Sequence, residues 1–199
     1  MAYPTVDGPY GLKPINLIGG QSFAGSVRHI PIVSGYASSI FCGDAVKVAS
    51  DGTLQRVADG AADEVIGVFL GCAYTDSTMG FMNRQYWPAD QVAADAVGLV
   101  CDDPDALFKV AVVSTGTTMG TLSRAECLNL NFELEVNSGS TSSGNSTMAL
   151  DNASGATTAT LPLRVIDVVE ETKNVSTGEY YEVVVKFNAH RYNDTTGVA

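Results

Sequence analysis

Short strand-like runs separated by turn residues most limit what this chain can fold into. Nowhere do apolar residues follow a helical period for more than about two turns. They alternate with polar residues instead, most strictly over residues 128–136, where every second side chain is Leu, Phe or Val. An Asp51-Gly52 step between two such runs is a strong hairpin signal. The pattern predicts an all-β fold of small β-barrel or β-sandwich modules with little helix.

The expected strands follow from this alternation and from the turn residues that bound it. They cover residues 27–33, 40–48, 53–57, 64–74, 96–101, 106–113, 128–136, 160–169 and 179–188. Residues 123–127 are the exception, because Ser123 with Glu126 three positions later forms a minimal capping box and predicts one helical turn. Residues 137–160 are rich in Ser, Thr, Gly and Asn and predict a long β-connection.

Proline and glycine set the N-terminal segment apart. Pro4, Pro9 and Pro14 fix φ and remove backbone donors, so a continuous helix is disfavoured. We predict an extended N-terminal arm at residues 1–24, a first β-barrel-like module at 25–115 and a second β-module at 116–199. The arm either packs on its own domain or reaches a neighbouring subunit, and both possibilities stay open. Its candidate partner contacts are Tyr3, Pro4, Tyr10, Leu12, Pro14, Ile15 and Leu17.

The charge balance argues against one class of function. Asp and Glu number 22 against 11 Lys and Arg, which gives a formal net charge of -11. The cations are scattered as well as few, so packaging of nucleic acid is not expected. No window reaches the ~20 apolar residues that span a bilayer, and residues 1–20 do not have the pattern of a signal peptide. We therefore expect synthesis in the cytoplasm, no nucleic acid or membrane partner, and free thiols at the four cysteines.

Few residues are placed for chemistry. His29 and His190 each stand beside an arginine, and both are expected at the surface. No serine lies in a GxSxG elbow, and no glycine-rich stretch carries the lysine of a phosphate loop. The carboxylates of Asp102-Asp103-Pro104-Asp105 could hold a hard cation, but aspartate before proline is ordinary turn chemistry, and we favour the turn. No catalytic residue, metal site or cofactor is predicted.

An aromatic segment at residues 81–88 contains the only tryptophan, Trp87. Its side chains either fill one end of a module or anchor a protein partner, because Trp, Tyr, Met and Arg are enriched at interface cores. We assign Trp87 to the core. Phe81, Met82 and Arg84 are kept as candidate contacts with a partner.

Several motifs together resemble a known family. They are RHIPIVSGYASS at 28–39, FCGDAVKV at 41–48, SDGT at 50–53, VIGVFLGCAY at 65–74, YWP at 86–88, DDPDALF at 102–108 and TLPLRV at 160–165. Over residues 12–192 the chain resembles the decoration or cement proteins of tailed-bacteriophage heads. The resemblance implies a structural virion protein without enzymatic activity, which binds the outer face of an icosahedral capsid. It also implies a homotrimer that bridges neighbouring subunits of the major capsid protein and stabilises the shell against the pressure of packaged DNA.

Two other classes of function remain open. The first alternative is a receptor- or glycan-binding β-module displayed on a virion surface, with residues 137–160 as its recognition tip. That segment contains no aromatic residue, which argues against sugar recognition there. The second alternative is a hydrolase built from dispersed residues, for which no motif provides support.

Overall fold

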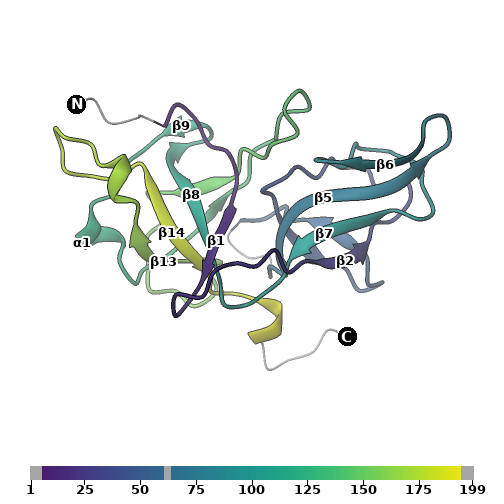
Figure 1. Ribbon diagram of the computed structural model, residues 1–199. Helices are drawn as coiled ribbons and strands as arrows, with labels where there is room; N and C mark the ends of the chain where they lie inside the picture. Colours follow the sequence, from purple (N-terminus) through teal and green to yellow (C-terminus); the bar gives the residue numbers. More distant parts are fainter. Residues whose placement is uncertain (1–5, 61–63, 194–199) are drawn as a thin grey trace.

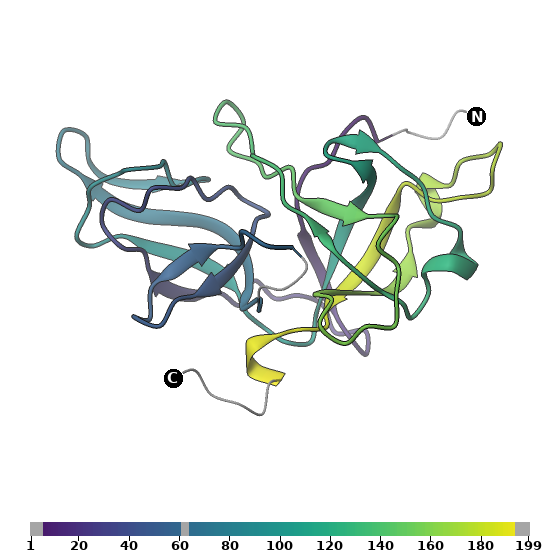
Figure 2. The ribbon, with the colours of Figure 1, turned by 180° about the vertical axis from the view of Figure 1, so that it is seen from behind.

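The strands of the chain form two sheets that lie side by side (Figures 1 and 2). The computed structural model describes residues 6–60 and 64–193. Helical structure within them is limited to α1 (Arg124–Cys127) and two short 3-10 turns, Glu170–Thr172 and Arg191–Asn193. The predicted all-β class is confirmed. Among these described residues, no helical segment has the length and apolar character of a membrane span.

The first sheet has the strand order β2-β7-β5-β3-β4, with β6 paired to the end of β5. Its strands are β2 (Arg28–Pro31), β3 (Ala45–Val48), β4 (Leu54–Arg56), β5 (Gly67–Asp76), β6 (Gly80–Arg84) and β7 (Val97–Cys101). All of its pairs are antiparallel. The hairpin expected at Asp51-Gly52 joins β3 to β4, and Gly52 has the positive φ of 81° that such a tight turn requires.

The second sheet has the order β10-β13-β14-β8-β12-β11, with β1 and β9 also paired to β8. Its strands are β1 (Lys13–Leu17), β8 (Ala106–Thr115), β9 (Thr118–Met119), β10 (Asn131–Phe132), β11 (Leu134–Glu135), β12 (Ala149–Asp151), β13 (Leu163–Val168) and β14 (Glu182–Phe187). The long strand β8 pairs with β14 in antiparallel register and with β12 in parallel register.

The predicted boundary between the two modules is wrong. Strand β8 was expected at the end of the first module, but it lies at the centre of the second sheet. The change of sheet therefore occurs in the turn at residues 102–105. Residues 13–17 of the predicted arm pack on their own domain, which is one of the two possibilities left open. As β1 they pair with β8 from Lys13 opposite Lys109 to Leu17 opposite Ala106.

The most regular alternation in the sequence does not form one strand. Residues 128–136 divide into β10 and β11, which pair with different strands, β13 and β12. Leu128 closes the preceding helical turn, since its N–H donates to the carbonyl of Arg124, and Asn129 takes a positive φ of 64°. Helix termination uses the first residues of the run, so only its second half is free to pair. The capped turn itself is confirmed: Glu126 N–H donates to Ser123 Oγ at 3.3 Å.

Two hydrophobic clusters lie beneath these strands, and one of them is shared between the sheets. The cluster around Trp87 belongs to the first sheet alone, and Trp87 is fully buried, which confirms its assignment to the core. The other cluster fills the second sheet but also includes Ala45, Val65 and Val68 from the first half of the chain. The two sheets therefore form one packed body through a common apolar region.

Candidate interaction surface

A tight turn between β5 and β6 builds an exposed apolar site on the first sheet. Asp76 Oδ1 accepts hydrogen bonds from the N–H groups of Met79 (2.9 Å) and Thr78 (2.8 Å), and these bonds hold the pKa of the carboxyl below its ordinary value. Gly80 supplies the positive φ of 78° that returns the chain into β6. The turn leaves Met79 and Phe81 each 68% exposed.

The pairing register shows which side chains share a face with Phe81. Phe81 lies opposite Thr75, Asn83 opposite Ala73, and Ala73 in turn opposite Val97. The same register extends across β7 to β2, and together these residues form a face that we call the open face. It consists of Phe81, Asn83, Ala73, Thr75, Val97, Leu99, His29 and Pro31.

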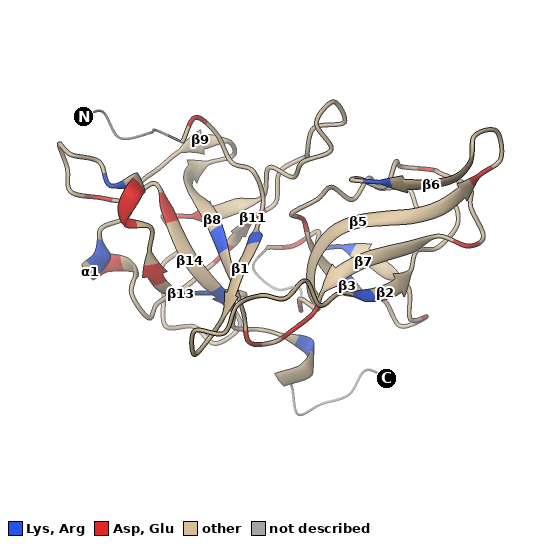
Figure 3. Cartoon of the chain, viewed as in Figure 1, with Lys and Arg blue, Asp and Glu red and all other residues tan. Residues whose placement is uncertain are grey.

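None of the eight strand residues of the open face is Lys, Arg, Asp or Glu, although the chain carries a net charge of -11. One carboxylate borders this face, since Asp95 Oδ2 accepts from Thr75 Oγ1 at 2.6 Å. Its members are exposed or half-buried, whereas the opposite face of the same strands includes the buried Cys72, Tyr74 and Val100. In Figures 1 and 3, no other segment crosses in front of β5 and β7, and colour for charge on β5 is confined to its end at Asp76. An uncharged, partly apolar surface of this kind is a candidate for contact with another protein.

Met82 and Arg84 point to the other side of the hairpin. Met82 lies opposite Tyr74 and Arg84 opposite Cys72, and both side chains are half-buried at the sheet edge. The structure thus separates the three candidates of β6. Phe81 lies on the open face, while Met82 and Arg84 lie at the margin of the core.

The predicted arm contacts are mostly used within the chain itself. Tyr10 donates its hydroxyl hydrogen to the buried carboxylate of Glu182, which Lys109 also contacts at 3.2 Å. Burial raises the pKa of Tyr10, and the Glu182 carboxylate adds to that rise. Leu12 is only 1% exposed, and its N–H donates to the carbonyl of Gly43 at 2.9 Å. Tyr10 and Leu12 therefore fasten the segment to its own domain, and the prediction of Leu12 as a partner contact is wrong.

The remaining arm candidates differ in where they lie. Pro14, Ile15 and Leu17 are half-buried in β1, and Leu17 packs against the shared core. Tyr3 and Pro4 lie outside the described residues. Among the described candidates, only Phe81 of β6 has most of its side chain exposed.

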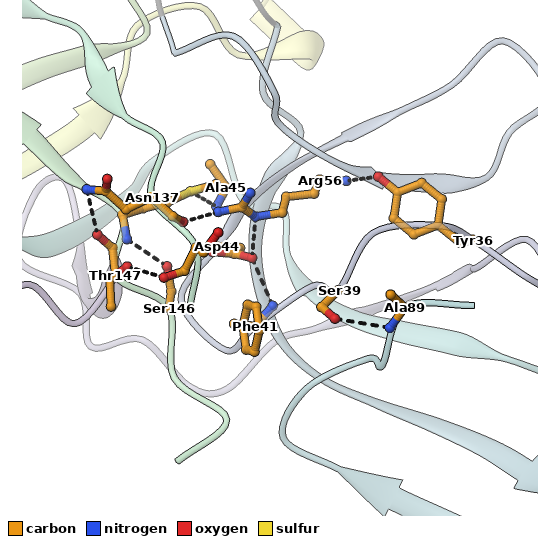
Figure 4. A network of polar contacts seen from close by, with 12 residues as sticks. Tyr36, Ser39, Phe41, Asp44, Ala45, Arg56, Ala89, Asn137, Ser146 and Thr147 are labelled. Atoms are coloured by element: carbon orange, nitrogen blue, oxygen red, sulfur yellow. Dashed lines mark hydrogen bonds and ion pairs between the residues drawn. The ribbon is translucent and has the colours of Figure 1, made fainter. Parts of the chain in front are cut away.

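A network of polar contacts joins the first sheet to the connection after β11 (Figure 4). Asp44 is fully buried, and its Oδ2 accepts from Arg56 Nε and from Phe41 N–H, both at 2.8 Å. Burial raises the pKa of the Asp44 carboxyl, and the Arg56 guanidinium opposes that rise. Arg56 also donates through Nη2 to the carbonyl of Asn137. One guanidinium therefore neutralises a buried charge and attaches the second half of the chain to the first.

The connection at 137–160 is not a free loop over its first part. Asn145 forms a parallel bridge with Cys42, and Gln85 Nε2 donates to Asn145 Oδ1 at 2.5 Å. Gly139 lies so close to Phe41 that an added Cβ would be 2.3 Å from the ring. Later in the connection, residues 149–151 form β12 in the second sheet. This segment contributes to the joint between the sheets.

Residues 102–105 form the expected turn, and their three carboxylates contact different partners. Asp103 Oδ1 accepts from the N–H of Asp105 at 2.8 Å, which is the turn chemistry expected. Asp102 pairs with Arg28 at 2.8 Å, and Asp105 pairs with Lys186 at 2.7 Å. Within residues 6–60 and 64–193, no three His, Cys, Asp or Glu side chains gather in a way that could hold a metal ion.

The other reactive groups are largely inaccessible. Cys72, Cys101 and Cys127 are buried free thiols and Cys42 is a partly buried one, which confirms the free-thiol prediction. Burial raises the pKa of Cys72 to about 12 and that of Cys101 to about 11, so neither thiol supplies a thiolate nucleophile near neutral pH. His29 is exposed as expected. The surface prediction for His190 is wrong, because its side chain is buried beside Phe187 and Tyr192.

Comparison of the chain with models of protein families, with curated protein sequences and with solved structures finds no match.

Proposed function

We propose that this chain is a structural protein of tailed-phage heads, which binds the outer surface of the capsid and links neighbouring major capsid protein subunits. The open face of the first sheet is the observation that carries the proposal. Its strand residues carry no charge and include the exposed Phe81, in a chain that is strongly acidic as a whole. The motif resemblance described above supports the same conclusion.

A docking protein of this kind acts by mass action and needs no catalytic group. Its free energy of binding to the assembled lattice adds to the stability of that lattice. Several weak contacts become firm when one particle presents many identical sites. The net charge of -11 suits a protein on the outside of the shell, because it disfavours contact with packaged DNA and keeps unbound copies soluble.

The glycan-binding alternative receives less support. Its expected recognition tip, residues 137–160, is anchored to the first sheet through Gly139 and Asn145 and to the second sheet through β12. A recognition loop would be expected to leave more of its length available for a ligand. The part of the connection between these anchors is short and contains no aromatic residue.

Binding to shells that lack this protein tests the proposal. Purified protein is mixed with expanded capsids of the same phage, and the bound fraction is measured by co-sedimentation. We expect Phe81→Ser to weaken binding by about tenfold or more, since truncating an aromatic hot-spot residue costs about 2 kcal/mol or more at an interface. Val175→Ser is the matched control, because Val175 is 74% exposed but lies in the second half of the chain.

Two results would contradict the proposal. Wild-type protein that stays in the supernatant at any concentration removes the capsid as partner. Equal binding by Phe81→Ser and wild type removes the open face from the mechanism. Deletion of residues 1–17 is not a clean test of an arm, because it also removes β1 and the buried Leu12.

A further inference from the structure

Strand β6 has one edge without a backbone partner. Its residues Gly80–Arg84 pair with β5 along one side, and the described part of the chain forms no backbone hydrogen bond along the other. In an antiparallel strand, alternate residues direct their N–H and C=O groups away from the existing neighbour. The outer edge of β6 therefore presents a row of groups ready to pair with another strand.

Features that normally protect a sheet edge are missing from β6. The strand at the opposite edge, β2, has them: Arg28 carries a charge, and the exposed Pro31 cannot donate a hydrogen bond. Strand β6 contains no proline and no bulge, and its only charge is at its last residue, Arg84. Its second residue, Phe81, is instead exposed and lies next to the exposed turn. Such an edge is a template for strand addition.

We propose that β6 pairs with β6 of a second copy of this chain, antiparallel and about a two-fold axis. Antiparallel overlap of all five residues determines the register. Met82 lies opposite Met82 of the second copy, and Arg84 lies opposite Gly80. Each copy contributes the same surface, as a two-fold interface requires.

The charges at this edge are complementary in that register. Arg84 forms no ion pair within the described residues. Gly80 lies next to Asp76 on β5, and Asp76 and Arg84 are on the same face of the hairpin. Pairing through β6 brings Arg84 of each copy toward Asp76 of the other, and the two-fold axis repeats this contact. Two acidic chains thus meet where their opposite charges face each other.

The inference goes beyond the proposed function and does not depend on it. Pairing makes the first sheets of two copies continuous, so the two open faces form one larger uncharged surface. We thus propose a dimer in place of the trimer that the family resemblance implies. A doubled surface would engage two capsid sites at once, which raises the effective affinity.

Sedimentation velocity of the purified chain without capsids tests the pairing. We expect a concentration-dependent monomer–dimer equilibrium for the wild type. Met82→Lys and Met82→Glu each place like charges directly opposite one another at the two-fold axis, so each alone should raise the dimer dissociation constant about tenfold or more. An equimolar mixture of the two variants should dimerise again, because the charges across the axis are then opposite.

Val175→Lys is the control for a surface charge away from the edge and should leave the dimer unchanged. Circular dichroism checks that the variants are folded. If a Met82 variant is unfolded, Arg84→Glu replaces it, because the new carboxylate would face Asp76 of the second copy. A monomeric or trimeric wild type overturns the inference. The inference is also overturned if the Met82 variants dimerise with the same dissociation constant as the wild type, or if the mixture of the two variants does not dimerise. Shell binding by a monomer would overturn the pairing and leave the proposed function intact.

Discussion

His190 is a polar residue that packing by neighbouring side chains buries. His190 stands beside Arg191 in the sequence, which favours a surface position, yet its side chain is 2% exposed. Strand β14 ends at Phe187, three residues before it, and the imidazole turns back onto the Phe187 ring. Its Nδ1 accepts from the N–H of Tyr192 at 3.2 Å. Burial lowers the pKa of His190, since it disfavours the charged imidazolium.

This burial predicts a loss of stability in mild acid. The folded pKa lies below the unfolded value of about 6.5, so the unfolded chain binds more protons as the pH falls through that value. The free energy of unfolding should therefore decrease between pH 7.5 and pH 5.5, measured by urea denaturation. His190→Gln should reduce the difference between the two pH values, whereas the exposed His29→Gln should retain it. An unchanged difference in His190→Gln would show that other groups cause the loss.

Strand pairing decided elements that local pattern did not. The alternation at residues 128–136 predicts one strand, but hydrogen bonding to two different partners divides it into β10 and β11. Strand β6 lies in a segment that the sequence marks only by its aromatic residues, and it becomes a strand through pairing with β5. Close approach between strands also selects glycine. At Gly67 of β5, an added Cβ would lie 2.1 Å from the carbonyl oxygen of Cys101.

We predict that Gly67→Ala destabilises the fold by about 1–3 kcal/mol, the range of overpacking in a tight core. The clash is with backbone, so rotation of a side chain cannot relieve it. Gly8→Ala is the control, because no atom lies within 4 Å of the added Cβ. Urea denaturation provides the measurement. A Gly67→Ala midpoint equal to that of wild type would mean that β5 and β7 can separate at this point without cost.

The whole molecule is held together by contacts that cross between the two sheets. The shared core contains Val65 and Val68 from the first sheet region together with residues of the second sheet. Arg56 connects the buried Asp44 to the carbonyl of Asn137, and Leu134 N–H donates to the carbonyl of Gly60 at 3.0 Å. Neither half can expose this region without uncovering apolar surface and a buried charge.

Cooperative unfolding of both sheets is therefore expected. Trp87 is the only tryptophan and lies in the core of the first sheet, so its fluorescence follows that sheet alone. Its transition in urea should coincide with the transition in far-ultraviolet circular dichroism, which follows both sheets. Arg56→Ala leaves Asp44 buried without its partner. It should lower the free energy of unfolding by about 3 kcal/mol and shift the midpoints of both transitions together. Separate midpoints for the two signals would contradict a single cooperative unit.

Reading the amino-acid sequence alone is enough to predict the all-β class, the hairpin at Asp51-Gly52, the capped turn at Ser123 and the burial of Trp87. These features depend on neighbours a few residues apart or on a large apolar side chain, so local chemistry is enough to predict them. The folded chain is needed to see that β8 belongs to the second sheet, that Leu12 lies in the core and that Phe81 lies on the open face. Each depends on pairing between segments distant in sequence, where many registers satisfy the same alternation and packing of the whole chain selects one.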